Sequence, residues 1–213
     1  MSFIKTITAR SRLTWSALLA LSAVMSYAQA GNVSVKVTDA NGQPLADAAV
    51  YLEATGKQTL PKAVLKADIE QKARTFAPLV TVVQVGSEVS FPNNDTVRHH
   101  VYSFSMPKVF ELKLYSGVPG VPVVFDKPGT VVVGCNIHDR MVAYIHVVDT
   151  PYFARTDAAG MARIENVVAG KFTLKSWHYL QADQSQIQSQ AMVLTAADAT
   201  ASVRVTVTSP TPR

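Results

Sequence analysis

The stretch TVVVGCNIHDRM, residues 130–141, joins a β-branched run to three potential metal-binding side chains. Cys135, His138 and Met141 stand at intervals of three, directly after the run Thr130 to Val133. A thiolate, an imidazole and a thioether are soft ligands that favour copper. Because an unpaired cysteine is open to oxidation, metal ligation also explains its presence. The stretch therefore predicts a strand that leads into a metal-binding loop.

A fourth ligand has to come from another part of the chain. His99 and His100 follow the turn-forming residues Pro92 to Asp95 and begin a predicted strand. Adjacent residues on a strand point to opposite faces, so only one of the two histidines can face the metal.

These residues together resemble a cupredoxin, the family of blue copper proteins that includes plastocyanin and amicyanin. The resemblance covers about residues 75–148, and the spacing of the Cys-x-x-His-x-x-Met loop is that of amicyanin, a protein associated with methylamine utilisation. It implies an antiparallel Greek-key sandwich with one type 1 copper site. The motifs that carry it are residues 86–95, His99 to Val101, Pro128 to Thr130 and residues 135–141.

The resemblance also implies a role for individual residues. By position, His99, Cys135 and His138 correspond to the trigonal copper ligands, and Met141 to the weak axial ligand. His100 takes the place of an asparagine that braces the cysteine loop in relatives.

Three further residues belong to this expected site. His100 and Asn94 are either supporting residues around the ligands or alternative ligands. Arg140 lies between His138 and Met141, where many relatives carry apolar docking residues, so we expect it to help dock a partner with an acidic surface.

Outside this region the sequence has the short β-rich runs and turn signals of an all-β protein. One segment, Ala63 to Arg74, has a weak helical pattern, and Gln181 to Gln190 is expected to form a polar loop. The predicted strands are 33–37, 49–52, 81–85, 88–91, 100–104, 121–125, 130–133, 142–148, 162–167, 171–177 and 202–207.

The two ends of the chain resemble the two halves of one module, the prealbumin-like sandwich of carboxypeptidase regulatory-like domains. The halves are residues 31–55 and 154–208, and they carry the turns Asp39 to Pro44 and Thr156 to Gly160. Residues 56–153 would then be an inserted cupredoxin domain and residues 209–213 a loose tail. Insertion at a loop tip costs little, because closure entropy grows with the logarithm of loop length. The alternative is one larger irregular sandwich.

Residues 1–30 have the pattern of a secretory signal peptide. Lys5, Arg10 and Arg12 precede an apolar stretch from Leu13 to Met25, and small residues follow at 28 and 30. The alternative is a membrane anchor, but the apolar run is shorter than the about 20 residues needed to cross a bilayer. We expect a periplasmic chain beginning at Gly31, without a transmembrane segment.

The net charge of +5 comes largely from the first thirty residues. They hold three basic residues and no acidic one, which leaves 17 basic and 15 acidic residues in the remainder. A near-neutral remainder without a basic stripe gives no reason to propose nucleic-acid binding.

The predicted function is an exported type 1 copper protein that carries single electrons between redox partners such as a cytochrome c or a dehydrogenase. The alternatives are copper binding or delivery, and a β-sandwich interaction module without redox activity. The chain has five histidines and no His-x-His pair, so it lacks the ligands of a trinuclear copper cluster. It is therefore not predicted to be an enzyme.

Overall fold

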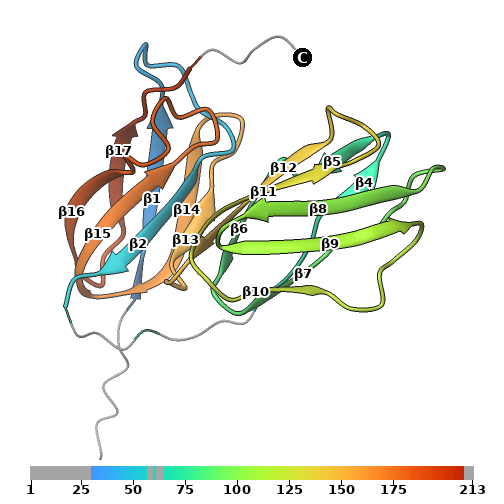
Figure 1. The fold of residues 1–213 in the computed structure, drawn as a ribbon. Coiled ribbons are helices and arrows are strands. Elements are labelled where there is room, and N and C mark those ends of the chain that lie inside the picture. The colour runs from blue at the N-terminus through green and yellow to red at the C-terminus, as the bar shows by residue number, and fades with distance from the viewer. Residues whose placement is uncertain (1–29, 57–59, 61–64, 209–213) are drawn as a thin grey trace, which may run out of the picture.

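The computed structural model describes residues 30–56, 60 and 65–208, and in these residues the chain forms strands and no helix. The all-β prediction is therefore confirmed. Figure 1 shows two β-bodies side by side. We call the body formed by β1, β2 and β13 to β17 the outer sandwich, and the body formed by β3 to β12 the inner sandwich.

The outer sandwich is built from both ends of the described chain. In its first sheet, β1 (Ala30–Thr38) lies between β14 (Met161–Val168) and β17 (Ala199–Arg204), antiparallel to β14 and parallel to β17. The second sheet has the order β13-β2-β15-β16, formed by Phe153–Arg155, Ala49–Ala54, Gly170–Trp177 and Gln188–Leu194. The two sheets share one apolar core.

The inner sandwich contains a five-stranded sheet, a three-stranded sheet and a small hairpin around a second core. The five-stranded sheet has the order β6-β12-β11-β8-β9, formed by Val80–Gln84, Val142–Val148, Gly129–Cys135, His99–Ser105 and Lys108–Tyr115. The three-stranded sheet has the order β10-β7-β3, formed by Val123–Phe125, Ser87–Ser90 and Lys66–Asp68, and the hairpin is β4 (Glu70–Lys72) with β5 (Thr75–Ala77).

Alternation along β11 brings Cys135 into the inner core. Val131, Val133 and Cys135 are buried, whereas Val132 is exposed between them. β-Branched residues favour an extended chain, and the period of two places every second side chain inside. The same alternation on β8 buries His99 and leaves His100 on the opposite face.

A third apolar cluster joins the two sandwiches. Ala49 and Trp177 of the outer sandwich pack with Val80 of the inner one, and Tyr144 and Tyr179 lie beside them. We call this contact the seam. We propose domain boundaries near residues 56 and 153, where the chain passes from one sandwich to the other.

Two sequence predictions about secondary structure are wrong. In the described part of Ala63 to Arg74, the chain forms β3 and β4 in place of a helix, because burial of Ile69 and Gln71 follows a period of two. The polar loop expected at Gln181 to Gln190 ends earlier, because β16 begins at Gln188 and pairs with β15.

The expected signal peptide and the expected tail, residues 209–213, lie outside the described residues, except that Ala30 begins β1. Within residues 30–56, 60 and 65–208, no helix has the length and apolar character that crossing a membrane would require.

Candidate metal centre

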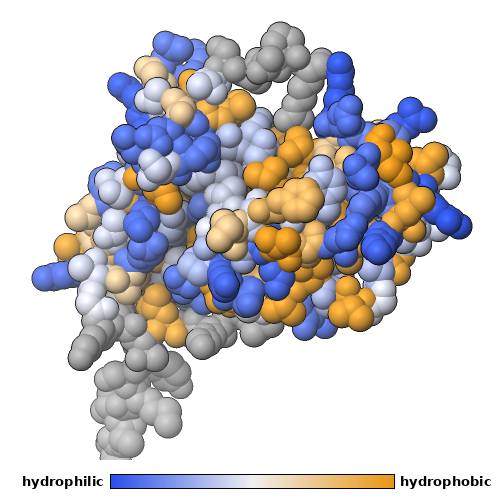
Figure 2. Space-filling view, in the orientation of Figure 1, coloured by the Kyte–Doolittle hydropathy of each residue, from blue (hydrophilic) through white to orange (hydrophobic). Residues whose placement is uncertain are grey.

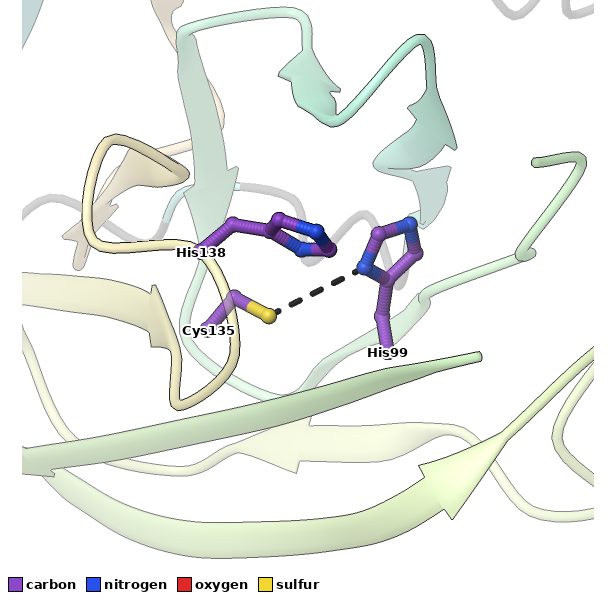
Figure 3. Close-up of side chains that lie close together, drawn as sticks. All are labelled: His99, Cys135 and His138. Atoms are coloured by element: carbon purple, nitrogen blue, oxygen red, sulfur yellow. Dashed lines mark hydrogen bonds between the residues drawn. The ribbon is translucent and has the colours of Figure 1, made fainter. Parts of the chain in front are cut away.

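Three side chains with metal-binding atoms converge at the end of the inner sandwich where β8 begins and β11 ends. His99, Cys135 and His138 each offer one ligand atom, and these atoms all lie within 4.8 Å of one another. Figure 3 shows the two imidazole rings and the sulfur pointing toward a common point. Among the His, Cys, Asp and Glu side chains of the described residues, no other group of three or more could hold a metal ion.

Each of the three residues is held by the backbone around it. His99 opens β8, Cys135 closes β11, and His138 lies in the loop that leads to β12. The Met141 N–H donates to the carbonyl of His138 (2.9 Å), and the Cys135 N–H donates to the carbonyl of Met141 (3.3 Å). The loop therefore closes on itself, which fixes its side chains relative to the sheet.

The donor set fits a metal ion in distance and in chemistry. The His99 Nδ1 lies 3.8 Å from the Cys135 Sγ. A nitrogen and a sulfur at about 2.0 and 2.3 Å from one ion stand about 3.7 Å apart when the angle between them is about 120°. The Nδ1 of His138 is shielded from solvent and has no hydrogen-bond partner in the described chain. An unpaired buried nitrogen beside a thiol and an imidazole is a ligand in place for an ion.

Met141 belongs to the same loop. Its side chain is 2 % exposed and packs in the inner core with Cys135. Its main chain is tied to both His138 and Cys135. The thioether is thus buried within the loop that holds two of the three clustered side chains.

The structure separates His100 and Asn94 from this cluster. His100 points to the other face of β8, where its Nε2 lies 2.9 Å from the Oε1 of Glu111, at ion-pair distance but without hydrogen-bond geometry. Asn94 is exposed, and its amide donates to the Oε1 of Glu70 (2.9 Å). Arg140 is exposed on the loop between His138 and Met141.

Asp95 braces His99 from the side away from the sulfur, and sequence reasoning missed it. Its Oδ2 lies 3.1 Å from the His99 Nε2 and accepts the Arg74 N–H at 2.7 Å. The Arg74 N–H, and after it the His99 ring, hold the pKa of Asp95 below its usual value. A carboxylate on one ring nitrogen fixes the tautomer and leaves the other nitrogen free to bind a metal.

Asn93, one residue before the predicted Asn94, shapes the turn that carries Asp95. Its amide donates to the carbonyls of Val97 (3.0 Å) and Tyr115 (2.8 Å), and its oxygen accepts the Asp95 N–H (3.0 Å). The Asn-Asn-Asp sequence signals such a turn, but it does not tell which asparagine faces inward.

Replacing Asp95 by Asn is expected to weaken metal binding about 10- to 100-fold, because the His99 ring loses its carboxylate partner. The bracing persists below the usual pKa of an aspartate and is lost as the pH falls through the lowered pKa of Asp95. Competition with a chromophoric chelator at pH 7 measures the affinity. Asp139→Asn, an exposed carboxylate of the ligand loop, is the matched control. Equal affinities for the two variants would contradict the bracing role.

No family model matches the sequence, and no curated protein matches it. Solved structures that resemble part of the chain include a purple cupredoxin from Nitrosopumilus maritimus, 24 % identical, with a TM-score of 0.35, covering 38 % of this chain and 99 % of its own. A copper-containing nitrite reductase from Thermus scotoductus is 24 % identical, with a TM-score of 0.37, covering 54 % of this chain and 28 % of its own. A plastocyanin from Dryopteris crassirhizoma is 16 % identical, with a TM-score of 0.33, covering 38 % of this chain and 99 % of its own.

Likenesses of this size transfer no activity to the chain. Two facing sheets enclose the inner core, and Cys135 reaches that core from the end of β11. His99 and His138 meet the sulfur from β8 and from the loop after β11. The inner sandwich therefore has the two facing sheets and, at one end, the His-Cys-His cluster that the resemblance to cupredoxins predicts.

Proposed function

We propose that the protein is an exported type 1 copper protein that carries single electrons between redox partners. The observation that carries this proposal is the convergence of His99, Cys135 and His138, with the His138 Nδ1 buried and unpaired in the described chain. His99, Cys135 and His138 would be the trigonal ligands, and Met141 a weak axial one. Copper bound there would supply a one-electron couple at a thiolate.

The chain's own part would be to hold the ligands still. The His99 ring is fixed by Asp95, and the loop from Cys135 to Met141 is closed by main-chain hydrogen bonds. Ligands that keep one intermediate geometry in both oxidation states require little rearrangement, which favours fast electron exchange. Val131 and Val133 are both buried and would keep water from the core side of the site.

The rim of the site supports docking of a partner protein. His138 is partly exposed, and the neighbouring Ile137 is 49 % exposed beside the charged Asp139 and Arg140. We propose that a cytochrome c or a dehydrogenase approaches over this mixed rim, with Arg140 contributing charge complementarity. The chain would then act as a carrier and not as an enzyme.

Reconstitution with one equivalent of Cu(II) tests this function. A strong visible thiolate-to-copper charge-transfer band and a narrow copper hyperfine splitting, followed by reversible reduction with a small c-type cytochrome, are expected. Bound copper with that band but without exchange with the cytochrome would favour copper delivery. Absence of tight copper binding would contradict both copper functions and would favour a β-sandwich interaction module without redox activity.

Replacing Arg140 by Glu is expected to slow association with an acidic-faced redox partner, and more at low than at high ionic strength, because salt screens exposed charges. Stopped-flow reduction of the copper-loaded protein at two salt concentrations measures the rate. Lys36→Glu, an exposed residue on β1, changes the net charge equally and is the control. The same salt dependence in both variants would contradict a docking role.

A further inference from the structure

His146 lies in the seam and takes no part in the metal cluster. It stands on β12 and is 2 % exposed. The Trp177 ring of the outer sandwich stacks on it at 4.6 Å with an interplanar angle of 12°, and the Tyr51 ring lies 5.4 Å away. The outer sandwich thus packs directly against this imidazole.

Only one of the two ring nitrogens of His146 has a partner. Its Nδ1 lies 3.0 Å from the Oγ1 of Thr130 on β11, whereas its Nε2 is buried without a hydrogen bond in the described chain. A neutral imidazole tolerates a bare nitrogen. A protonated one would bury both a charge and an unpaired N–H, and each of these carries a desolvation penalty.

The surroundings of His146 offer no counter-ion. It is faced by the Tyr51 phenol of β2, Trp177 of β15, the Thr130 hydroxyl of β11 and Val82 of β6, none of which is charged at neutral pH. Among the described residues, Glu53 lies beside Tyr51 and is already paired with Lys175 at 2.7 Å. Attraction to the Trp177 ring offsets part of the cost of a cation but leaves its N–H unpaired. Burial lowers the pKa of His146 to about 4.

We propose that neutral His146 is a latch between the two sandwiches, and that its protonation in acid releases Trp177 from the inner sheet. In the open state the imidazole meets water and regains its ordinary basicity. Opening therefore becomes steadily easier as the pH falls from the usual histidine pKa to the lowered one, and the gain is complete below the lowered pKa.

The latch acts on the strand pair that carries the metal-binding loop. His146 pairs with Thr130, and the β11–β12 ladder runs from there to Gly134 and Val142 at the loop. Release of the outer sandwich therefore frees one face of that ladder. The contact between His146 and Trp177 does not require a bound metal, so metal-free protein is used for the test.

Trp177 provides the measurement. The sequence has two tryptophans, Trp15 and Trp177, so Trp177 is the only one in the exported chain expected to begin at Gly31. As the pH falls from the usual histidine pKa to about 4, its emission is expected to shift to the red and its quenching by acrylamide to rise about twofold or more, reversibly. The far-UV circular dichroism of the strands is expected to persist through this transition.

His146→Gln cannot take up a proton in this range and is expected to abolish the transition. His178→Gln is the matched control, because His178 is also buried but its two nitrogens pair with the Ala46 carbonyl and the Leu180 N–H. A transition that survives in His146→Gln, or an emission change that coincides with loss of the strand signal, would overturn the proposal.

Should His146→Gln not fold at neutral pH, ring-proton NMR of the unaltered chain decides the matter. Titration of the His146 resonance together with the Trp177 emission supports the latch. A His146 ring that titrates at a different pH from the Trp177 change contradicts it.

Discussion

The copper-loaded Cys135→Ser variant is expected to lose the visible charge-transfer band completely and to bind Cu(II) at least about 100-fold more weakly. Loss of a direct ligand should weaken metal binding by more than the 10- to 100-fold expected when a residue that only supports a ligand, such as Asp95, is replaced. A serine hydroxyl is not deprotonated at neutral pH and is a poor ligand for a soft ion. Serine is nearly the same size as cysteine, and the His99 Nδ1 beside this position offers its buried hydroxyl a partner, so the fold itself should survive.

Absorption spectra and copper titrations of the Cys135→Ser variant and of the unaltered chain measure the loss of the band and of the affinity. Met141→Leu is the matched control, since it removes another buried sulfur from the same loop but only the proposed axial contact. It is expected to keep the band and to alter the reduction potential. A band that persists in Cys135→Ser would show that the sulfur of Cys135 is not a copper ligand.

Replacing Phe125 by Ala is expected to destabilise the inner sandwich by about 3–5 kcal/mol, the usual cost of emptying a buried phenylalanine site. Phe125 is fully buried on β10, and its ring meets that of Phe110 edge to face at 6.1 Å. Urea unfolding followed by far-UV circular dichroism measures the change in unfolding free energy.

Phe104→Ala provides the comparison, because Phe104 is 80 % exposed on β8 of the same sandwich. Its removal is expected to change the unfolding free energy by no more than about 0.5 kcal/mol. Similar losses for the two variants would contradict the division of side chains between core and surface.

Much of the fold and of the candidate site follows from local pattern. The β-branched run before Cys135 alternates between core and solvent, so both the strand and the inward direction of the sulfur can be predicted from the sequence. The choice of His99 over His100 as the ligand cannot be predicted from this alternation, because alternation requires only that the two side chains face opposite ways. It came from the family resemblance, and the structure places His99 beside the sulfur.

The remaining parts of the site depend on contacts between distant segments. Asp95, which braces His99, is itself held by the N–H of Arg74, which lies 21 residues earlier in the chain. β9 was not predicted, because its apolar residues are interspersed with Lys108, Glu111 and Lys113 on an edge strand. His146 lies within the predicted strand 142–148. No pattern in its own strand shows that Trp177 lies across from it.

The parallel pairing of β1 with β17 sets an order of assembly. Val33 pairs with Ala199, and the Asn32 N–H donates to Asp198, 166 positions along the chain. Contacts of such long sequence separation form late, because the entropy of the intervening loop must be lost first. The strands of the inner sandwich find all their sheet partners between residues 66 and 148, so a chain synthesised from its N-terminus can complete that body first. During that interval β1 lacks both of its sheet neighbours, so its inward residues Val33, Val35 and Val37 stay uncovered until the last strand of the chain arrives.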